Sequence, residues 1–334
     1  MTPKQMDKRL VRLFLEALAV GDAYGKATEY CTRQEIAGRY ERIGRILPPQ
    51  EALAHKDLAW GSVTDDTEQN IYLIREYART GMIDAKSTAL CLLRWLKETD
   101  AMKYIGPSSL HALRFIQDGG DIDAAGSCGT TCGGIMRTPS AFLFSTHETL
   151  ERNVVECLRP THNTAVAMEA AMSYAYALEE ASQMECTLES VLGRAKTGAA
   201  RGRLHGDATR ANGVGPSVSA RIDFIGRLVD KDISDQALEE LLYDVIGSTM
   251  ASADVACAVF AIFMHTRGDA ARAIEIATMT GGDSDTIACL AAGLCTLFSK
   301  GHDIPQEEIA LVEQANGLDF DGIADMIVGK GDMT

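Results

Sequence analysis

Apolar residues recur at spacings of three and four along most of this chain. Clear stripes of this kind occupy residues 10–18, 71–78 and 167–178. Such spacing matches the period of an amphipathic α-helix, whereas a half-buried strand alternates apolar and polar residues. No convincing alternating stretch is present. The pattern therefore predicts an all-α fold of roughly a dozen or more helices.

Residues that break helices lie between these stripes, at 47–49, 105–107, 126–134 and 213–216. Ser217, Ser234 and Ser252 stand where helices would begin and are candidate N-caps. No Gly/Ser-rich or Pro-rich linker divides the chain. We therefore expect residues 1–334 to form a single compact domain, with 202–216 as its longest polar loop.

The composition agrees with a folded helical protein. Hydrophobic residues make up 46%, charged residues 24% and aromatic residues 6% of the chain, a globular profile poor in the residues typical of sheets. The apolar runs 255–264 and 287–298 are shorter than the roughly 20 residues that a membrane span requires, so we expect buried helices and no membrane partner. Residues 1–14 lack the apolar core of a signal peptide. These features predict a cytoplasmic protein.

The net charge and the cysteine pattern argue against a nucleic-acid-binding protein and against a zinc site. The formal net charge of −15 argues against a nucleic-acid surface, which needs clustered Lys and Arg. The nine cysteines are scattered through apolar helical surroundings and are expected to be reduced thiols. Cys128 and Cys132 have no second Cys/His pair, which argues against a zinc site.

Two acidic stretches lie where helical patterns begin. Thr64-Asp65-Asp66 precedes a stripe that starts near Glu68; alone, such residues more often cap a helix than carry chemistry. In the second stretch, a Gly281-Gly282 turn precedes Asp283 and Asp285. One of these carboxylates could cap a helix, but the other would be repelled unless a cation lay between them. Four aspartates with neighbouring threonine hydroxyls offer enough hard oxygen ligands for two Mg²⁺ or Mn²⁺ ions.

Five motifs in the chain carry a family resemblance. They are GDAYGKATEY (21–30), GSVTDDT (61–67), GGIMRTP (133–139), THNTAVAMEAA (161–171) and GGDSDTIACLAAGL (281–294). Together they resemble the ADP-ribosylglycohydrolase family, which includes ADP-ribosylarginine hydrolases and the hydrolase that reactivates ADP-ribosylated dinitrogenase reductase. A lone TDDT is a weak signal, whereas five motifs in family order over residues 21–294 are specific.

The resemblance implies an all-α domain with a dinuclear Mg²⁺ or Mn²⁺ centre in a cleft. Carried over by motif, the metal ligands would be Thr64, Asp65, Asp66, Asp283, Asp285 and Thr286. Glu29 and Asp66 would be the catalytic carboxylates, with Glu29 orienting or deprotonating the attacking water. Asp22 would be structural and would cap a tight turn between helical segments.

The Gly-rich loop 126–134 would cradle the pyrophosphate and ribose of the substrate, since glycine permits a close backbone approach and a helix N-terminus favours phosphate. The expected substrate-binding residues are Gly126, Ser127, Gly129, Thr131, Cys132, Gly133, Gly134 and His162. The family commonly has Asn where Cys132 stands, so the hydrogen bonds to substrate would differ here. Arg137 is expected to form an internal ion pair, and Asp254 matches an acidic family position without an assigned role.

The activity implied is hydrolysis of the glycosidic bond between ADP-ribose and an acceptor, with arginine on a protein as the leading acceptor. Some arginine-directed members carry an acidic residue where this chain has Tyr104, which makes recognition of a guanidinium less assured. The alternatives are a hydrolase of small conjugates such as O-acetyl-ADP-ribose, an immunity protein against an ADP-ribosylating toxin, and a non-catalytic, crystallin-like binding protein. The partner would be an ADP-ribosylated protein or a small conjugate, and the oligomeric state stays open, a monomer included.

Overall fold

The computed structural model describes residues 6–208, 214–229 and 233–329 of the chain. Across these residues the regular structure is helical, and the backbone bridge between Thr131 and Ala251 is an isolated one. The predicted all-α fold is therefore confirmed. None of the helices in this part of the chain has the length and apolar character needed to cross a membrane.

The α-helices are α1 (Lys8–Gly25), α2 (Arg33–Ala37), α3 (Asp65–Thr80), α4 (Ala85–Glu98), α5 (Pro107–Gln117), α6 (Ile122–Ala125), α7 (Thr138–Leu143), α8 (Leu150–Leu158), α9 (Ala165–Ala181), α10 (Leu188–Ala208), α11 (Val218–Leu228), α12 (Asp235–Leu241), α13 (Ser252–Thr266), α14 (Ala270–Thr280), α15 (Ser284–Ser299), α16 (Gln306–Asn316) and α17 (Phe320–Val328). Short 3₁₀ turns are η2 (Lys26–Thr28), η3 (Ala101–Lys103), η4 (Gly126–Cys128) and η5 (Ile135–Arg137), and η6 (Leu242–Ile246) is a π-helical turn.

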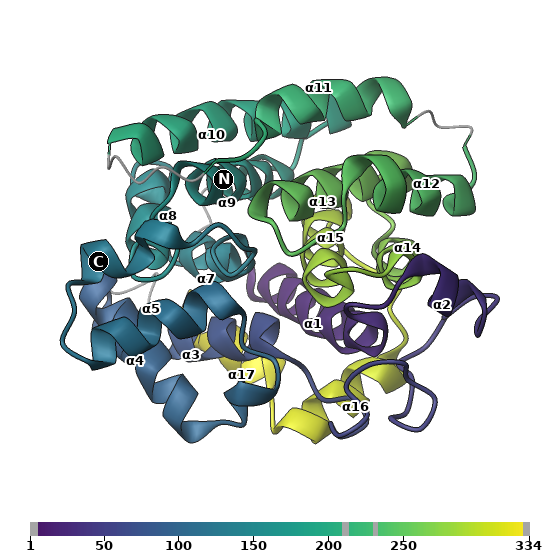
Figure 1. Ribbon diagram of the computed structural model, residues 1–334, viewed down its shortest axis with the longest axis horizontal. Coiled ribbons are helices and arrows are strands. Elements are labelled where there is room, and N and C mark those ends of the chain that lie inside the picture. Colours follow the sequence, from purple (N-terminus) through teal and green to yellow (C-terminus); the bar gives the residue numbers. More distant parts are fainter. Residues whose placement is uncertain (1–5, 209–213, 230–232, 330–334) are drawn as a thin grey trace.

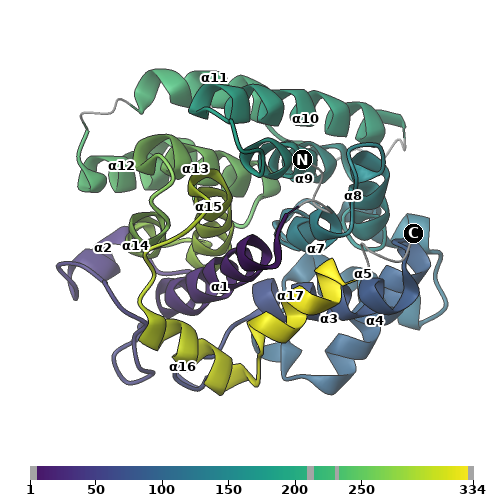
Figure 2. The ribbon, with the colours of Figure 1, turned by 180° about the vertical axis from the view of Figure 1, so that it is seen from behind.

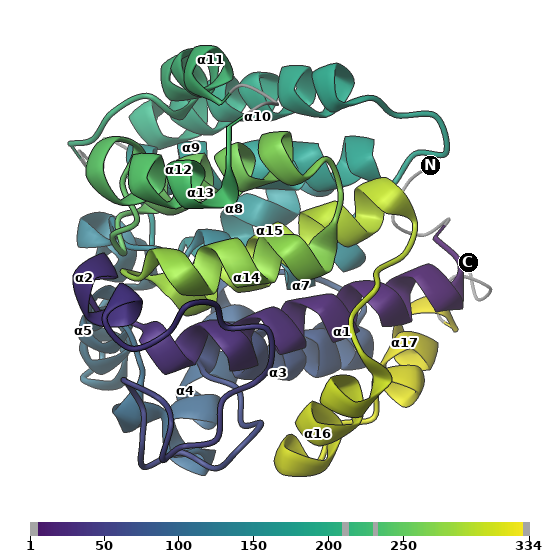
Figure 3. The same cartoon turned by 90° about the vertical axis from the view of Figure 1, so that its right-hand side faces the viewer.

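The helices form layers around a buried centre. Helices α10 and α11 run along one side of the molecule and α3, α4, α16 and α17 along the other, with α1, α9, α13 and α15 between them (Figure 1, Figure 3). Seen from behind, α17 lies in the foreground and packs beside α1 and α3 (Figure 2). Buried apolar residues from α1 to α17 make one hydrophobic cluster. The central helices are apolar on all sides because they have helices on all sides.

Burial reaches the chemically important residues of the central helices. Every residue of α1 from Leu13 to Gly25 is buried, and every residue of α13 except Asp254 is buried. Helix α15 is buried from Ser284 to Leu297. Carboxylates on α1 and α15 are therefore held inside the protein, where each needs hydrogen bonds or a counter-charge.

The predicted loop at 202–216 is wrong in its first half. Residues 202–208 belong to α10, while 209–213 lie outside the described residues. Glycines in this part of α10 serve helix packing. A Cβ at Gly198 would lie 2.3 Å from the Met172 carbonyl oxygen, and one at Gly202 would lie 2.2 Å from that of Met168. Glycine at four-residue spacing lets α10 approach α9 closely.

Two of the three predicted N-caps are confirmed. The side chains of Ser217 and Ser234 accept hydrogen bonds from Ala220 N and Ala237 N at the starts of α11 and α12. The prediction for Ser252 is wrong, because α13 begins at Ser252 itself and has Ala251 as its N-cap. The Ser252 hydroxyl lies 2.6 Å from the Thr131 carbonyl oxygen and ties α13 to the Gly-rich segment.

Candidate metal centre

Helices α1 and α15 approach each other at glycine positions of the first motif. A Cβ at Gly21 would lie 2.6 Å from the Ala288 carbonyl oxygen, and one at Gly25 would lie 2.3 Å from that of Ser284. No side chain larger than hydrogen fits at either position without moving a backbone. The C-terminal end of α1 is therefore packed directly on the N-terminal turn of α15, where Asp283 and Asp285 lie.

Backbone hydrogen bonds join the segments that follow these two helix ends. Tyr30 N donates to Gly282 O at 2.7 Å, and Gly282 N donates to Cys31 O at 3.1 Å. Gly281 and Gly282 have φ values of +77° and +75°, which favour glycine. A Cβ at Gly282 would also lie 2.0 Å from the Ser248 carbonyl oxygen. The predicted Gly-Gly turn is present, and it sets Glu29 beside Asp283.

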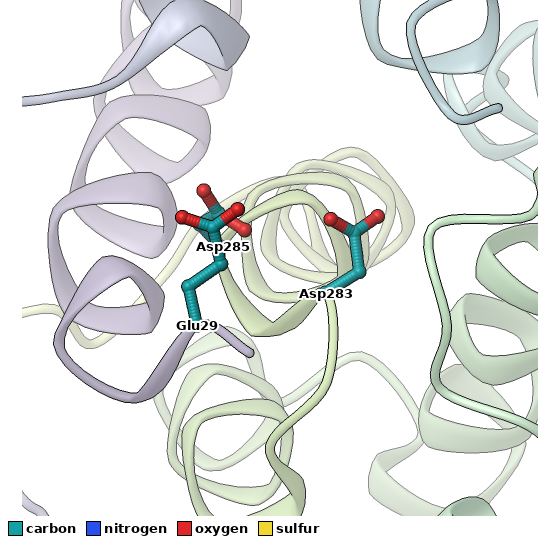
Figure 4. Close-up of side chains that lie close together, drawn as sticks. All are labelled: Glu29, Asp283 and Asp285. Carbon is teal, nitrogen blue, oxygen red and sulfur yellow. The ribbon is translucent and has the colours of Figure 1, made fainter. Parts of the chain in front are cut away.

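Three buried carboxylates converge at this turn. Each of Glu29, Asp283 and Asp285 offers an oxygen, and these oxygens lie within 4.8 Å of one another. Figure 4 shows the Glu29 carboxylate beside that of Asp285. Asp283 lies on the same chain segment as Asp285, two residues before it. Exposed acidic groups often cluster without a ligand, but these three are at most 5% exposed. Buried carboxylates in such proximity require a positive charge or protons.

The second acidic motif lies against the same cluster. The Thr64 hydroxyl oxygen is 3.4 Å from Asp285 Oδ2, and the Thr286 hydroxyl donates to Asp66 Oδ2 at 3.2 Å. Asp65 lines the same pocket and accepts a hydrogen bond of 3.1 Å from the Gln69 side chain. Residues 64–66 and 283–286, more than two hundred positions apart in the chain, therefore meet at one site.

The site carries the donor atoms that a divalent cation needs. Asp66 Oδ1, Asp283 Oδ2 and Asp285 Oδ1 are buried oxygens without a hydrogen-bond partner. Unpaired buried oxygens of this kind are costly unless a cation satisfies them. All are carboxylate oxygens, the hard ligands that Mg²⁺ and Mn²⁺ prefer. The residues present thus fit a divalent metal.

The raised pKa values of the aspartates show that ionising this cluster is unfavourable without a counter-charge. Burial, followed by the charge of neighbouring carboxylates, raises the pKa of Asp65, Asp66 and Asp285 well above the usual range. Burial and then the charge of Glu29 raise the pKa of Asp283 to about 7. Ionising the whole set is therefore unfavourable without a further positive charge, and the described lining of the site contains neither lysine nor arginine.

Asp22 has a different role from the predicted turn cap. It lies within α1, and its two carboxylate oxygens accept hydrogen bonds from the backbone N–H groups of Thr64 and Thr67, each at 3.0 Å. It also accepts from both threonine hydroxyls. Asp22 thus caps the N-terminus of α3 from a neighbouring helix and holds the Thr64–Asp66 turn against α1.

A pocket opens over this cluster, and Glu29, Asp65, Asp66, Asp283 and Asp285 are among the residues that line it. Further lining residues are Tyr104, Gly106, Pro107 and Ser109 from 104–109, Thr131, Cys132, Gly133 and Met136 from 131–136, and the separate residues Tyr30 and Met250.

The sequence profile of the ADP-ribosylglycohydrolase family matches residues 2–333. The chain belongs to the ADP-ribosylglycohydrolase family. It is accordingly a hydrolase of the type that acts on ADP-ribosylated substrates.

Individual relatives agree with this assignment. Uncharacterized protein YegU of Escherichia coli strain K12 is 28% identical over 314 residues, which cover 92% of each chain. An uncharacterized protein of Archaeoglobus fulgidus is 29% identical over 295 residues, 86% of this chain and 87% of that one. The ADP-ribosyl-[dinitrogen reductase] glycohydrolase of Rhodospirillum rubrum is 37% identical over 97 residues, 29% of this chain and 31% of that one. A solved chain of an ADP-ribosylglycohydrolase-related protein complex shares the fold, with a TM-score of 0.68 at 20% identity over 97% of this chain and 99% of that chain.

The Gly-rich loop of this ADP-ribosylglycohydrolase reaches the pocket only at its second half. Of its predicted substrate-binding residues, Thr131, Cys132 and Gly133 line the pocket. A Cβ at Gly126 would lie 2.2 Å from the Arg159 carbonyl oxygen, and one at Gly129 would lie 2.1 Å from that of Thr161.

The other predicted binding residues of the Gly-rich loop do not line the pocket. Ser127 is exposed, and its hydroxyl donates to Ala124 O. A Cβ at Gly134 would meet His162 Cβ and Leu158 at 3.1 Å. Gly126, Ser127, Gly129 and Gly134 therefore have packing or backbone roles in this structure, and a direct contact of theirs with substrate stays a prediction.

Backbone hydrogen bonds fix the second half of the loop to the α13 side of the pocket. Cys132 N donates to Met250 O at 2.8 Å, and Ser252 N donates to Thr130 O at 3.0 Å. Asp254 holds the chain just before α13, since its carboxylate accepts from Arg221 and from the Thr249 hydroxyl at 2.7 Å each. The family's acidic position at 254 is thus a scaffold for the pocket rim.

The predicted ion pair of Arg137 is wrong. Arg137 is fully buried, but no carboxylate of the described chain lies within ion-pair distance of it. Its guanidinium donates to Gln69 Oε1 at 3.1 Å and to the Thr161 hydroxyl. Gln69 in turn donates to Asp65. The Gln69 amide thus bridges Arg137 and Asp65 by two hydrogen bonds.

His162 contributes to the pocket from behind. It is fully buried, with Nε2 at 3.0 Å from the Thr131 hydroxyl and Nδ1 at 2.8 Å from the Thr161 hydroxyl. Burial, and then the charge of Arg137, lowers the pKa of His162 well below its usual value. A neutral ring that supports Thr131 is consistent with the predicted role in shaping the pocket.

Sequence reasoning missed several residues of this site, including Gly106, Pro107, Ser109 and Met136 of the pocket lining. Tyr30 and Met250 line the pocket, and His55 contacts Glu29. Met250 and His55 lie in irregular segments whose path the local sequence does not reveal. Tyr30 is the last residue of the first motif, which was a usable signal.

Proposed function

We propose that this hydrolase binds two divalent cations, Mg²⁺ or Mn²⁺, and cleaves the glycosidic bond between ADP-ribose and an acceptor, with arginine on a protein as the favoured acceptor. The observation that carries the proposal is the set of unpartnered, buried oxygens of Asp66, Asp283 and Asp285. They come from two motifs more than two hundred positions apart, and burying their oxygens without partners is costly unless a cation satisfies them.

The residues that would hold the ions are those predicted from the motifs: Thr64, Asp65, Asp66, Asp283, Asp285 and Thr286. Divalent cations supply Lewis acidity, which makes a water nucleophilic near neutral pH and orients hydroxyl groups of a sugar. Glu29 would accept the proton of the attacking water, and it also lies close enough to Asp283 and Asp285 to share an ion with them. Asp66 would orient the water, and the carboxylates together would stabilise positive charge that develops at the ribose.

The charge of the pocket supports a cationic acceptor. Its described lining includes five carboxylates and neither lysine nor arginine. The missing acidic residue at position 104 has a counterpart in space, because Glu68 lies near Tyr104: burial, and then the charge of Glu68, raise the pKa of Tyr104. Glu68 also accepts from the Trp95 indole at 2.8 Å. A guanidinium leaving group beside Tyr104 would therefore meet an aromatic ring with a carboxylate behind it, an arrangement that attracts cations.

The deciding experiment measures release of ADP-ribose from ADP-ribosylated arginine with added Mg²⁺, with Mn²⁺, or with excess chelator. We expect release with either ion and none with chelator. O-acetyl-ADP-ribose assayed in parallel tests the small-conjugate alternative. The variant Asp283→Asn should be inactive and Asp321→Asn, at an exposed ion pair with Lys8, should be active. Equal cleavage with chelator present would refute the proposal.

Two further properties belong to the same proposal. All nine cysteines are free thiols, which supports a cytoplasmic location, where thiols stay reduced. The continuous hydrophobic cluster from α1 to α17 supports a single domain over the whole chain.

A further inference from the structure

The irregular chain between α2 and α3 folds back along the segment that carries Glu29. Leu53 N and Ala54 N both donate to Ala27 O at 3.0 Å, so two consecutive residues are bound to one carbonyl oxygen of η2. The Lys26 ammonium extends this attachment, since it donates to the Ser62 hydroxyl at 2.9 Å. The segment is therefore held against the first motif at two places, residues 53–54 and Ser62.

Directly after the bonded pair, His55 adopts a left-handed backbone conformation with φ of 49°. Non-glycine residues adopt this conformation when the surrounding structure imposes it, and such positions cluster at functional sites. The conformation turns the His55 ring inward. Its side chain is 12% exposed, and His55 Nε2 contacts Glu29 Oε2.

The hydrogen bond between His55 and Glu29 can run in only one direction. A carboxylate accepts hydrogen bonds, so the ring nitrogen donates. Glu29 has a buried side chain, 4% exposed, and faces the like charges of Asp283 and Asp285. Repulsion among the three favours rotation of Glu29, the longest and most flexible of them, away from the other two. A donor behind the carboxylate opposes that rotation.

We propose that His55 is a positioning residue of the metal centre, whose ring holds the Glu29 carboxylate in the orientation in which it meets Asp283 and Asp285. The inference rests on the proposed function, because it assigns the held carboxylate to metal binding. Groups that hydrogen-bond to metal-binding carboxylates contribute about 10- to 100-fold to metal affinity or activity. Loss of the His55 donor should therefore weaken ion binding by about that factor.

The test uses variants that differ in the donor and share the backbone conformation. His55→Leu and His55→Ala remove the donor, whereas His55→Gln keeps an N–H group on a side chain of similar reach. All three carry a similar left-handed backbone cost, so the comparison reports the hydrogen bond. The matched control is His302→Leu, since His302 and Glu16 form a buried pair, each 4% exposed, at a distance of 3.2 Å and outside the pocket lining.

Mg²⁺ affinity is measured without substrate, from the rise in melting temperature with Mg²⁺ concentration and from calorimetric titration. We expect His55→Leu and His55→Ala to need about 10- to 100-fold more Mg²⁺ than the wild type, and His55→Gln and His302→Leu to stay near the wild type. A melting curve in chelator first shows whether each variant is folded. If His55→Leu does not fold, His55→Ala is used in its place. Saturating Mg²⁺ should restore much of kcat in a donor-less variant.

The outcomes separate this inference from the proposed function. If neither Mg²⁺ nor Mn²⁺ stabilises or binds to the wild type, the proposed function fails. If the wild type binds Mg²⁺ and the donor-less variants bind it equally well, the role of His55 is refuted. The role is also refuted if His55→Gln is as impaired as His55→Leu, because the hydrogen bond is then not the cause.

Discussion

Gly25 lies so close to Ser284 that a Cβ at position 25 would come within 2.3 Å of the Ser284 carbonyl oxygen. This contact joins the last turn of α1 to the first turn of α15, and the acidic residues of both motifs lie within a few positions of it. The spacing of the carboxylates therefore depends on a backbone-to-backbone contact between residues that are 259 positions apart.

Replacement of Gly25 by alanine should disturb the centre without touching a carboxylate. We expect Gly25→Ala to lower the free energy of unfolding by about 1–3 kcal/mol, since both backbones must separate to admit a methyl group, and to weaken Mg²⁺ binding. Gly193→Ala is the control, because a Cβ at Gly193 in α10 meets nothing within 4 Å, and it should leave stability unchanged or raise it. Urea denaturation of both variants decides; equal stability of Gly25→Ala and the wild type would contradict this packing.

Metal-free protein should become less stable as the pH rises. The pKa of Asp283 is about 7 in the fold, against about 3.9 in an unfolded chain. Between these values the folded state holds a proton that the unfolded state has released. The stability that this carboxyl contributes is therefore complete below about pH 4 and is lost as the pH rises through about 7.

Ions that bind the ionised form should reverse this trend. The rise in melting temperature on adding Mg²⁺ should be larger near pH 8 than near pH 5.5, because at the lower pH the ion must displace protons. Melting curves at the two pH values, each with chelator and with Mg²⁺, measure the difference. A rise that is independent of pH, or larger at the lower pH, would mean that these carboxylates do not receive the ion.

Asp283→Asn should separate stability from activity. Removal of one buried charge relieves the repulsion from Glu29, so in chelator this variant should melt at or above the temperature of the wild type. It should also lose at least about 100-fold in activity and most of its response to Mg²⁺. Melting in chelator and hydrolysis with Mg²⁺ are compared with Asp321→Asn. A variant that is unstable in chelator would instead indicate that Asp283 is a structural residue.

Asp22→Ala should loosen the start of α3. The variant removes the acceptor for the backbone N–H groups of Thr64 and Thr67, so we expect a loss of about 2 kcal/mol in unfolding free energy, the upper end for a lost N-cap. Because Asp65 and Asp66 follow directly, Mg²⁺ affinity should fall as well. Chemical denaturation and calorimetry test the two effects, and unchanged Mg²⁺ affinity would show that the turn is held without Asp22.

Glu68→Gln should affect cationic acceptors selectively. The carboxylate lies behind Tyr104 and does not line the pocket. If it attracts a guanidinium, its neutralisation should lower kcat/KM for ADP-ribosylated arginine about tenfold, which corresponds to about 1.4 kcal/mol. Hydrolysis of O-acetyl-ADP-ribose, which has a neutral leaving group, should change little. A similar loss on both substrates would assign Glu68 to the fold rather than to acceptor choice.

Sequence reasoning recovered the helices and the residues of the acidic centre, and it failed where a residue's partner is distant. Asp22 and Arg137 were given local roles, as a turn cap and an ion-pair member. Their partners in the structure lie on other helices, at Thr64 and Gln69. The glycines at 202 and 206 show the same limit, since helix-packing glycines and loop glycines are identical in a one-dimensional pattern.

The amino-acid sequence by itself determined the all-α class and the set of carboxylates, because helical periodicity is a local property and each acidic motif is a short continuous string. Only the tertiary structure decided that Asp66, Asp283 and Asp285 share one buried site, and that His55 reaches Glu29. Those contacts depend on how closely two helix backbones approach and on where an irregular segment turns. Both are set by the packing of the whole chain and produce no repeating pattern in the sequence.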